Sequence, residues 1–138
     1  MDKLFFNGNL YTMNPKTPRA QAALARDGRF FAVGTNEEIL RLKTRDAQTV
    51  DLNGATVYPG FTDSHLHILN LAHTARGLEL GTCKTRAAGT EERLGRIQTG
   101  FLADMSAFPK DFSQIPAEEI QLQSPVMTVV GGRVREHT

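Results

Sequence analysis

Residues 57–67 read VYPGFTDSHLH, in which a Pro-Gly turn precedes two histidines two positions apart, His65 and His67. Side chains alternate between the two faces of an extended strand, so both imidazoles would point to the same side. Imidazole nitrogen is a preferred ligand of zinc and related divalent ions. Asp63 falls on the same face by parity, as a candidate ligand or as a group that orients one. The stretch therefore predicts part of a metal site.

A His-x-His pair also has a plainer interpretation, namely two polar side chains at the end of a strand. Zinc takes about four ligands, and about three of them come from protein even in a catalytic site. Groups that could complete a site on the following segment are His73, Glu79 and Cys83. The sequence favours a simpler interpretation for two of them, an exposed helix residue for His73 and a small buried or idle thiol for Cys83.

The residues before this stretch predict a sheet made of hairpins. Asn7-Gly8, Asp27-Gly28 and Asn53-Gly54 each stand between short apolar runs. Asn-Gly and Asp-Gly tolerate the positive φ angles of tight type I′ turns, the usual turns of two-residue hairpins. The three dipeptides therefore predict three hairpins within residues 1–60.

One short helix and a C-terminal return to strands complete the expected elements. The run Thr35-Asn36-Glu37-Glu38 has the pattern of a capping box and predicts a helix that ends near Lys43. After the histidines, we expect a strand over 103–108, a loop over 109–116 and a final hairpin around Gly131-Gly132.

The composition is that of an ordinary globular protein, with 40% hydrophobic and 22% charged residues in 138. A net charge of +1 with scattered lysines and arginines argues against a nucleic-acid partner. No apolar run reaches the roughly 20 residues of a membrane span. The single cysteine and the absence of a signal-peptide pattern lead us to expect a cytoplasmic protein.

Three motifs, in the same order along the chain, make the sequence resemble the amidohydrolase superfamily. Their residues are most similar to those of its amidohydrolase 3 branch. They are VYPGFTDSHLH (57–67), RLGRIQTGFLAD (93–104) and VMTVVGGRV (126–134), and the resemblance covers about residues 1–82 and 89–138. It implies a metal-dependent hydrolase, with zinc as the expected ion, that cleaves non-peptide C–N bonds in small-molecule amides or formamides. His65 and His67 would be metal ligands on the first strand of a (β/α)8 barrel.

A barrel of that kind needs about 250 residues. The remaining ligands of the superfamily, and an aspartate that acts as general base, come from later barrel strands that no segment here matches. Asp104 belongs to a motif that is structural in the family, and we assign it no catalytic role. We therefore expect a mainly β fold without a TIM barrel. Residues 1–60 plus 94–138 would form a composite β-sandwich with one short helix, and 61–93 would keep the first barrel strand and a connector.

Three functional hypotheses remain open. The chain is a truncated amidohydrolase with an incomplete catalytic site, in which metal binding is weak or absent. Alternatively, it is a non-catalytic sandwich that forms homo-oligomers or binds a partner through the face that a barrel would cover. Thirdly, it is a gene remnant with no function of its own. The apolar residues expected on the uncovered face are Phe61, Leu66, Ile68, Leu69 and Leu71.

Overall fold

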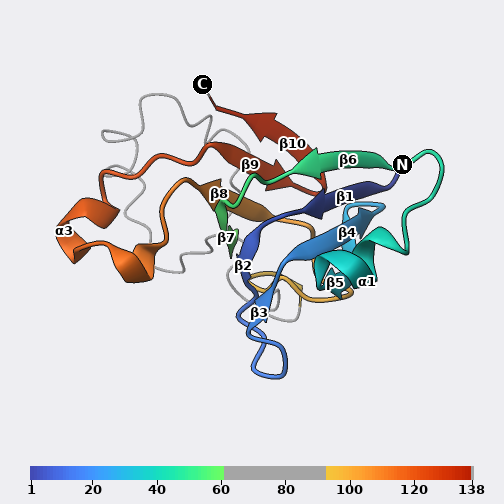
Figure 1. The fold of residues 1–138 in the computed structure, drawn as a ribbon, viewed down its shortest axis with the longest axis horizontal. Coiled ribbons are helices and arrows are strands. Elements are labelled where there is room, and N and C mark those ends of the chain that lie inside the picture. The colour runs from blue at the N-terminus through green and yellow to red at the C-terminus, as the bar shows by residue number, and fades with distance from the viewer. Residues whose placement is uncertain (61–92, 138) are drawn as a thin grey trace.

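The computed structural model describes residues 1–60 and 93–137, and all expectations for residues 61–92 lie outside the described part. The described residues form two sheets, of four and six strands (Figure 1). The first has the order β5-β4-β1-β6 and the second β10-β9-β8-β7-β2-β3. The strands of the first sheet are β1 (Lys3–Phe6), β4 (Ala22–Arg26), β5 (Arg29–Gly34) and β6 (Gln48–Asp51). Those of the second are β2 (Asn9–Tyr11), β3 (Arg19–Ala20), β7 (Thr56–Pro59), β8 (Met105–Phe108), β9 (Met127–Val130) and β10 (Arg133–Glu136).

Both chain ends contribute to the second sheet. Its central contact joins β7 to β8 in antiparallel register, with Val57 opposite Ala107 and Tyr58 opposite Ser106. Strands β2, β3 and β7 precede residue 60, whereas β8, β9 and β10 follow residue 93. The expected mainly β composite sandwich is therefore confirmed, and neither sheet closes into a barrel within the described ranges.

The main hydrophobic core lies between the sheets and draws on both ends of the chain. Its largest members are fully buried, among them Phe5, Phe30 and Ile97. The whole cluster is Phe5, Leu10, Ala23, Ala25, Phe30, Leu52, Val57, Ile97, Phe101, Ala103, Met105, Ala107, Met127 and Val129. Because burial of apolar area is the dominant favourable term in folding, the two ends stabilise each other.

Two of the three expected hairpins are absent. Strands β1 and β2 flank Asn7-Gly8 but belong to different sheets, as do β6 and β7 around Asn53-Gly54. Each dipeptide is a corner at which the chain passes from the first sheet to the second. The two corner segments run side by side, since β1 is parallel to β6 and β2 is parallel to β7. The prediction of hairpins at these two positions was wrong.

The corners are joined by backbone hydrogen bonds. Gly54 N–H donates to Asn7 O at 2.7 Å, and Asn9 N–H donates to Ala55 O at 3.0 Å. The Asn7 side chain adds a hydrogen bond to the Asp51 carboxylate at 3.2 Å. The two crossings therefore form one hydrogen-bonded unit that links the sheets.

Asp27-Gly28 and Gly131-Gly132 are true hairpin turns, as expected. They connect β4 to β5 and β9 to β10, both antiparallel pairs. Their φ angles are 50° and 77° for the first turn and 54° and 75° for the second. Asn53-Gly54 has nearly the same angles, 49° and 77°, although its flanking strands are unpaired with each other. The sequence therefore predicted the local conformation at Asn53-Gly54 correctly and the strand pairing incorrectly.

The expected helix is α1 (Asn36–Leu40), and its capping box is formed. Thr35 accepts a hydrogen bond from Glu38 N, and the Glu38 carboxylate accepts one from Thr35 N at 2.9 Å. The hydrogen bonds that the Glu38 carboxylate accepts from the backbone N–H and the hydroxyl of Thr35 lower the pKa of Glu38. Ile39 is buried and packs on the outer side of the first sheet, in a cluster with Leu4, Ala22 and Leu24.

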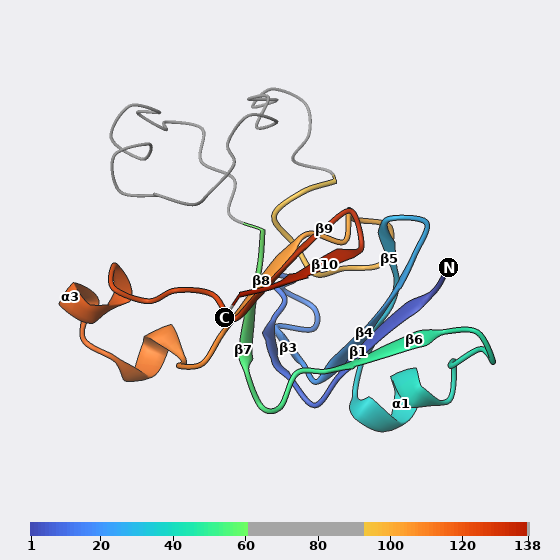
Figure 2. The same ribbon diagram turned by 90° about the horizontal axis from the view of Figure 1, so that it is seen from above.

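The segment between β8 and β9 has more helical structure than expected. Residues 109–116, expected to be a loop, contain the 3₁₀ turn η2 (Phe112–Gln114), and a second short helix follows, α3 (Ala117–Ile120). One helix was predicted from the sequence, whereas the described residues form α1, η2 and α3. Figure 2 shows that this segment and α1 lie on opposite sides of the molecule. No helix in residues 1–60 or 93–137 is long and apolar enough to cross a bilayer.

The first corner leaves no room for a side chain at Gly8, which gives a stability test. A Cβ there would lie 2.5 Å from Leu52 Cδ1 and 2.6 Å from Leu10 Cδ1, and both leucines are buried. We expect Gly8→Ala to lower the free energy of unfolding by about 1–3 kcal/mol, the usual cost of overpacking. Chemical denaturation would measure it.

Leu52→Val is the matched rescue, because it removes one of the two methyl groups that the new Cβ would meet. In the Gly8→Ala chain, Leu52→Val should lower the free energy of unfolding clearly less than it does in the natural chain, or should raise it. Strictly additive losses in the double variant would contradict the steric account.

Candidate functional site

The three sequence motifs meet at Asp104. Gly60, which ends the first described segment, donates its N–H to Asp104 O at 2.8 Å. A Cβ at Gly60 would lie 3.0 Å from Asp104 Cβ, so the two backbones approach each other closely. Asp104 Oδ1 accepts a hydrogen bond from Gly131 N at 2.6 Å. One residue thus connects the Pro-Gly turn, the returning segment and the final hairpin.

The residue before it, Ala103, joins the two hairpin turns. Ala103 N–H donates to Gly28 O at 2.8 Å, and Gly132 N–H donates to Ala103 O at 2.9 Å. A Cβ on Gly28 would lie 3.2 Å from Gly131 O. Because the turns of the two sheets are that close, the positive-φ glycines serve both turn geometry and packing between the sheets.

The geometry around Asp104 fixes both ends of the segment that carries the predicted metal ligands. The described chain ends at Gly60, beside Asp104, and it resumes at Arg93, whose carbonyl accepts from Leu102 N at 2.8 Å. His65 and His67 lie outside the described residues, and so do Asp63, His73, Glu79 and Cys83. Their role as metal ligands stays a prediction.

The described part does not supply a metal site by itself. In residues 1–60 and 93–137, no three side chains of His, Cys, Asp or Glu gather closely enough to hold an ion. The residues described there do not fit the metal that the motifs imply, and we derive no chemical step through it. The carboxylate of Asp104 is hydrogen-bonded to the hairpin turn, in agreement with its assignment as structural.

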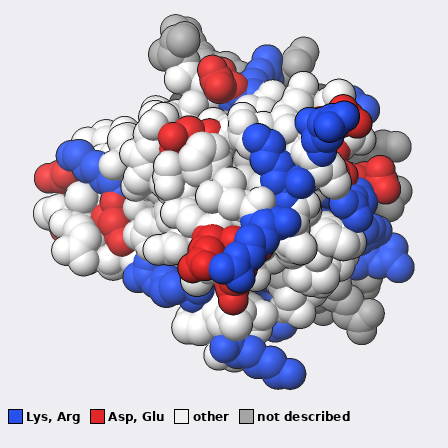
Figure 3. All heavy atoms as spheres, turned by 45° about the vertical axis from the view of Figure 1, so that its right-hand side comes forward, with Lys and Arg blue, Asp and Glu red and all other residues white. Residues whose placement is uncertain are grey.

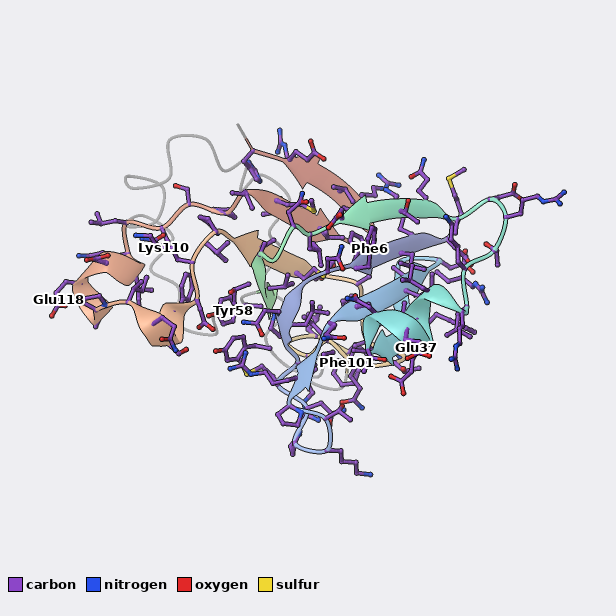
Figure 4. All side chains as sticks on the ribbon, in the orientation of Figure 1. Phe6, Glu37, Tyr58, Phe101, Lys110 and Glu118 are labelled. Carbon is purple, nitrogen blue, oxygen red and sulfur yellow. The ribbon has the colours of Figure 1, made fainter. Side chains whose placement is uncertain are left out.

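A polar and aromatic cluster, which the sequence did not predict, lies on the outer side of the second sheet. The ring of Tyr58, a residue labelled in Figure 4, stacks on Tyr11 and on Phe112, with centroid distances of 5.0 Å and 4.7 Å. The Arg19 guanidinium lies 3.2 Å above the centre of the Tyr11 ring. Asp111 accepts hydrogen bonds from the Tyr11 hydroxyl at 2.8 Å and from Ser113 N at 2.9 Å.

These contacts determine the protonation states of the cluster. Partial burial acts to raise the pKa of Asp111, but hydrogen bonds from Ser113 and Tyr11 and the charge of Arg19 outweigh it and lower the pKa to about 2. Burial raises the pKa of Tyr58 above its ordinary value, although its hydroxyl also accepts a hydrogen bond from Phe112 N at 2.9 Å. Near neutral pH the cluster is thus a phenol beside an ionised carboxylate.

This cluster is suited to structural attachment more than to proton transfer. Asp111 is too weak a base, and Tyr58 too weak an acid, to exchange protons readily near neutral pH. What the cluster does is fasten the segment 109–126 to strands β2 and β7. No local pattern could have revealed it, because Tyr11 and Asp111 are 100 residues apart in sequence.

Comparison with known proteins agrees with the motifs. The chain is 35% identical over 81 residues to the N-substituted formamide deformylase of Arthrobacter pascens, a match that spans 59% of this chain and 15% of that protein. No protein-family model matches.

Two solved structures match in part. One is an uncharacterized metal-dependent hydrolase from Pyrococcus furiosus, with 28% identity, a TM-score of 0.46, and coverage of 54% of this chain and 16% of that one. The other is enamidase, described as a member of the amidohydrolase superfamily, with 30% identity, a TM-score of 0.41, and coverage of 49% and 18%.

The fold is that of a composite β-sandwich, and its sequence relatives include hydrolases of C–N bonds. Its sequence relatives point to the amidohydrolase superfamily, since they include a formamide deformylase and the putative amidohydrolase YtcJ of Bacillus subtilis. The matched part of the chain spans about 15% of the length of the first curated relatives.

The role of Asp104 can be tested with a conservative pair of variants. Asp104→Ala removes the acceptor for Gly131 N–H and should lower the free energy of unfolding by about 1–2 kcal/mol. Asp104→Asn keeps an oxygen at that position and should lower the free energy of unfolding by less than half as much. Equal losses in the two variants, measured by urea unfolding, would show that the hydrogen bond is unimportant.

The Asp111 cluster predicts a pH dependence of stability. Because the pKa of Asp111 is lowered in the folded protein to about 2, its contribution is present above the ordinary value near 4 and is lost as the pH falls toward 2. At about pH 7, Asp111→Asn should destabilise by about 1–2 kcal/mol. The difference from the natural chain should shrink steadily between about pH 5 and pH 2.

The control is Asp46→Asn, since Asp46 is exposed. Its difference from the natural chain should be small over the same pH range. A constant deficit of Asp111→Asn down to about pH 2 would contradict the assignment of the ionised carboxylate as the stabilising form.

Proposed function

We propose that this chain is the sandwich part of an amidohydrolase that acts on non-peptide C–N bonds of small amides, and that it lacks this activity on its own. The activity is suggested by relatives such as the formamide deformylase of Arthrobacter pascens. The observation that carries the proposal is the junction at Asp104. Strands β7 and β8 are paired neighbours in the sheet, and the chain leaves β7 through Gly60 and enters β8 through Asp104, which are hydrogen-bonded to each other.

The length of that intervening segment supports the loss of activity. A (β/α)8 barrel takes about 250 residues, whereas 61–92 comprises 32. We propose a division in which 1–60 and 94–138 form the sandwich and 61–93 connects its halves. His65 and His67 would remain from the metal site, with zinc as the ion that the resemblance favours.

Hydrolysis at such a site needs groups that the described side chains do not supply. A bound divalent ion lowers the pKa of water and polarises a carbonyl group. The reaction also needs a base with a pKa near the working pH. Among the described carboxylates, Asp104 in the second motif and Asp111 in the cluster with Tyr11 both accept hydrogen bonds from the fold. Neither is available to activate water without breaking those contacts.

The experiment is a paired assay of zinc content and turnover on the full chain. Equilibrium dialysis followed by elemental analysis would give zinc per chain, and release of formate from an N-substituted formamide would give turnover. We expect clearly less than one zinc per chain and no formate above the buffer rate. A full-length formamide deformylase serves as the positive control.

A variant with both His65→Ala and His67→Ala separates bound metal from contamination. We expect it to match the natural chain in stability and in turnover. One zinc per chain that disappears in this variant, together with formate release, would overturn the proposal and would establish a working catalytic site.

A further inference from the structure

The hollow beside the returning segment is basic and has no acidic lining. Its lining residues are Arg29, Arg93, Thr99, Gly100 and Phe101, and its volume is about 320 Å³. Arg29 begins strand β5, and the others belong to the segment that returns to the sandwich. The two sides come from opposite halves of the chain, so the hollow exists only when the halves are assembled.

The backbone around the hollow is held in place by hydrogen bonds. Phe30 N–H donates to Phe101 O at 2.9 Å, and Gly100 N–H donates to Phe30 O at 2.8 Å. Gly100 has a φ of +89°, which a residue with a side chain rarely adopts. This geometry presents the Gly100 carbonyl to Arg29, whose Nη1 donates to it at 2.9 Å.

The two guanidinium groups are not neutralised by the rest of the described chain. Arg29 uses one of its roughly five N–H donors on the Gly100 carbonyl and keeps the others. Within residues 1–60 and 93–137, neither Arg29 nor Arg93 forms an ion pair. By contrast, Arg26 pairs with Asp2 at 2.6 Å, and Arg41 pairs with Glu37.

We propose that this hollow binds a small oxyanion, a carboxylate or a phosphate. Guanidinium groups pair with such anions through parallel charge-assisted hydrogen bonds, and the hydroxyl of Thr99 adds a neutral donor. None of the lining residues is one of the predicted metal ligands, and the proposal does not rest on the proposed hydrolase origin. Figure 3 shows basic and acidic side chains intermingled on the face that it displays, with no large area of one sign there.

The test uses inorganic phosphate and malonate as probes, with the full chain labelled for amide NMR. At low ionic strength we expect saturable shifts that centre on the amides of Thr99 and Gly100. Arg93→Gln should weaken binding by about tenfold, the scale of one lost charge-assisted hydrogen-bonded contact. The probe with the lower dissociation constant shows whether phosphate or carboxylate is the preferred group.

Arg135→Gln is the matched control, since Arg135 is an exposed arginine on β10 outside the lining. Arg135→Gln should change the dissociation constant by less than about twofold, because it removes an equal charge from outside the lining. Arg93→Gln should keep its fold, as the Arg93 side chain forms no hydrogen bond or ion pair in the described ranges, and its amide spectrum checks this.

Two results would overturn the proposal. If Arg135→Gln and Arg93→Gln weakened anion binding equally, the anion would be attracted by the positive charge of the whole protein and not by the hollow. Shifts that spread over the surface and disappear at about 150 mM salt would mean screening of exposed charges only. Saturable shifts confined to the hollow, and reduced by Arg29→Gln and Arg93→Gln alone, would support it.

Discussion

The structure depends on two chain segments that cross between the sheets side by side. Gly54 N–H to Asn7 O and Asn9 N–H to Ala55 O join the two crossings, and the strands before and after them are parallel neighbours. Parallel strands need a long connection, and here residues 12–47 provide it. They form β3, β4, β5 and α1, so most of the first sheet is built within that connection.

The second constraint is the contact of β7 with β8, which makes the C-terminal half part of the same sheet. Ala103 and Asp104 lead into β8 and bond to the turns of both sheets. The core cluster mixes residues from both halves, such as Phe5 with Ile97 and Val57 with Met105. Neither half could complete this core alone, because the second sheet, which covers one side of the shared interior, takes strands from both halves.

The sequence predicted the elements better than their pairing. Asp27-Gly28, Gly131-Gly132 and the capping box at Thr35 all formed as expected, because short-range geometry decides them. Asn53-Gly54 has the angles of a hairpin turn, but the strands on either side pair with other segments. A turn dipeptide fixes the local angles, whereas strand partners are chosen by burial and by contacts far apart in sequence.

The same limit applies to the candidate sites. The Asp111 cluster joins residues from β2, β7 and η2, and the basic hollow joins β5 to the returning segment. Each consists of ordinary residues that gain a chemical property only through assembly. The histidine pair is the opposite case, because two imidazoles of matching parity indicate metal chemistry before any fold is known.

The junction at Asp104 explains how one sandwich can accommodate inserts of very different length. Gly60 and Asp104 are hydrogen-bonded, so the ends of the intervening segment are held together by the sandwich itself. The entropy cost of closing a flexible loop grows only with the logarithm of its length. Replacing about 250 residues by 32 would change that cost by about 2 kcal/mol, and in favour of the shorter loop. Under the proposed function, loss of a barrel would remove the catalytic machinery and leave in place the contacts that hold the two ends of the chain together.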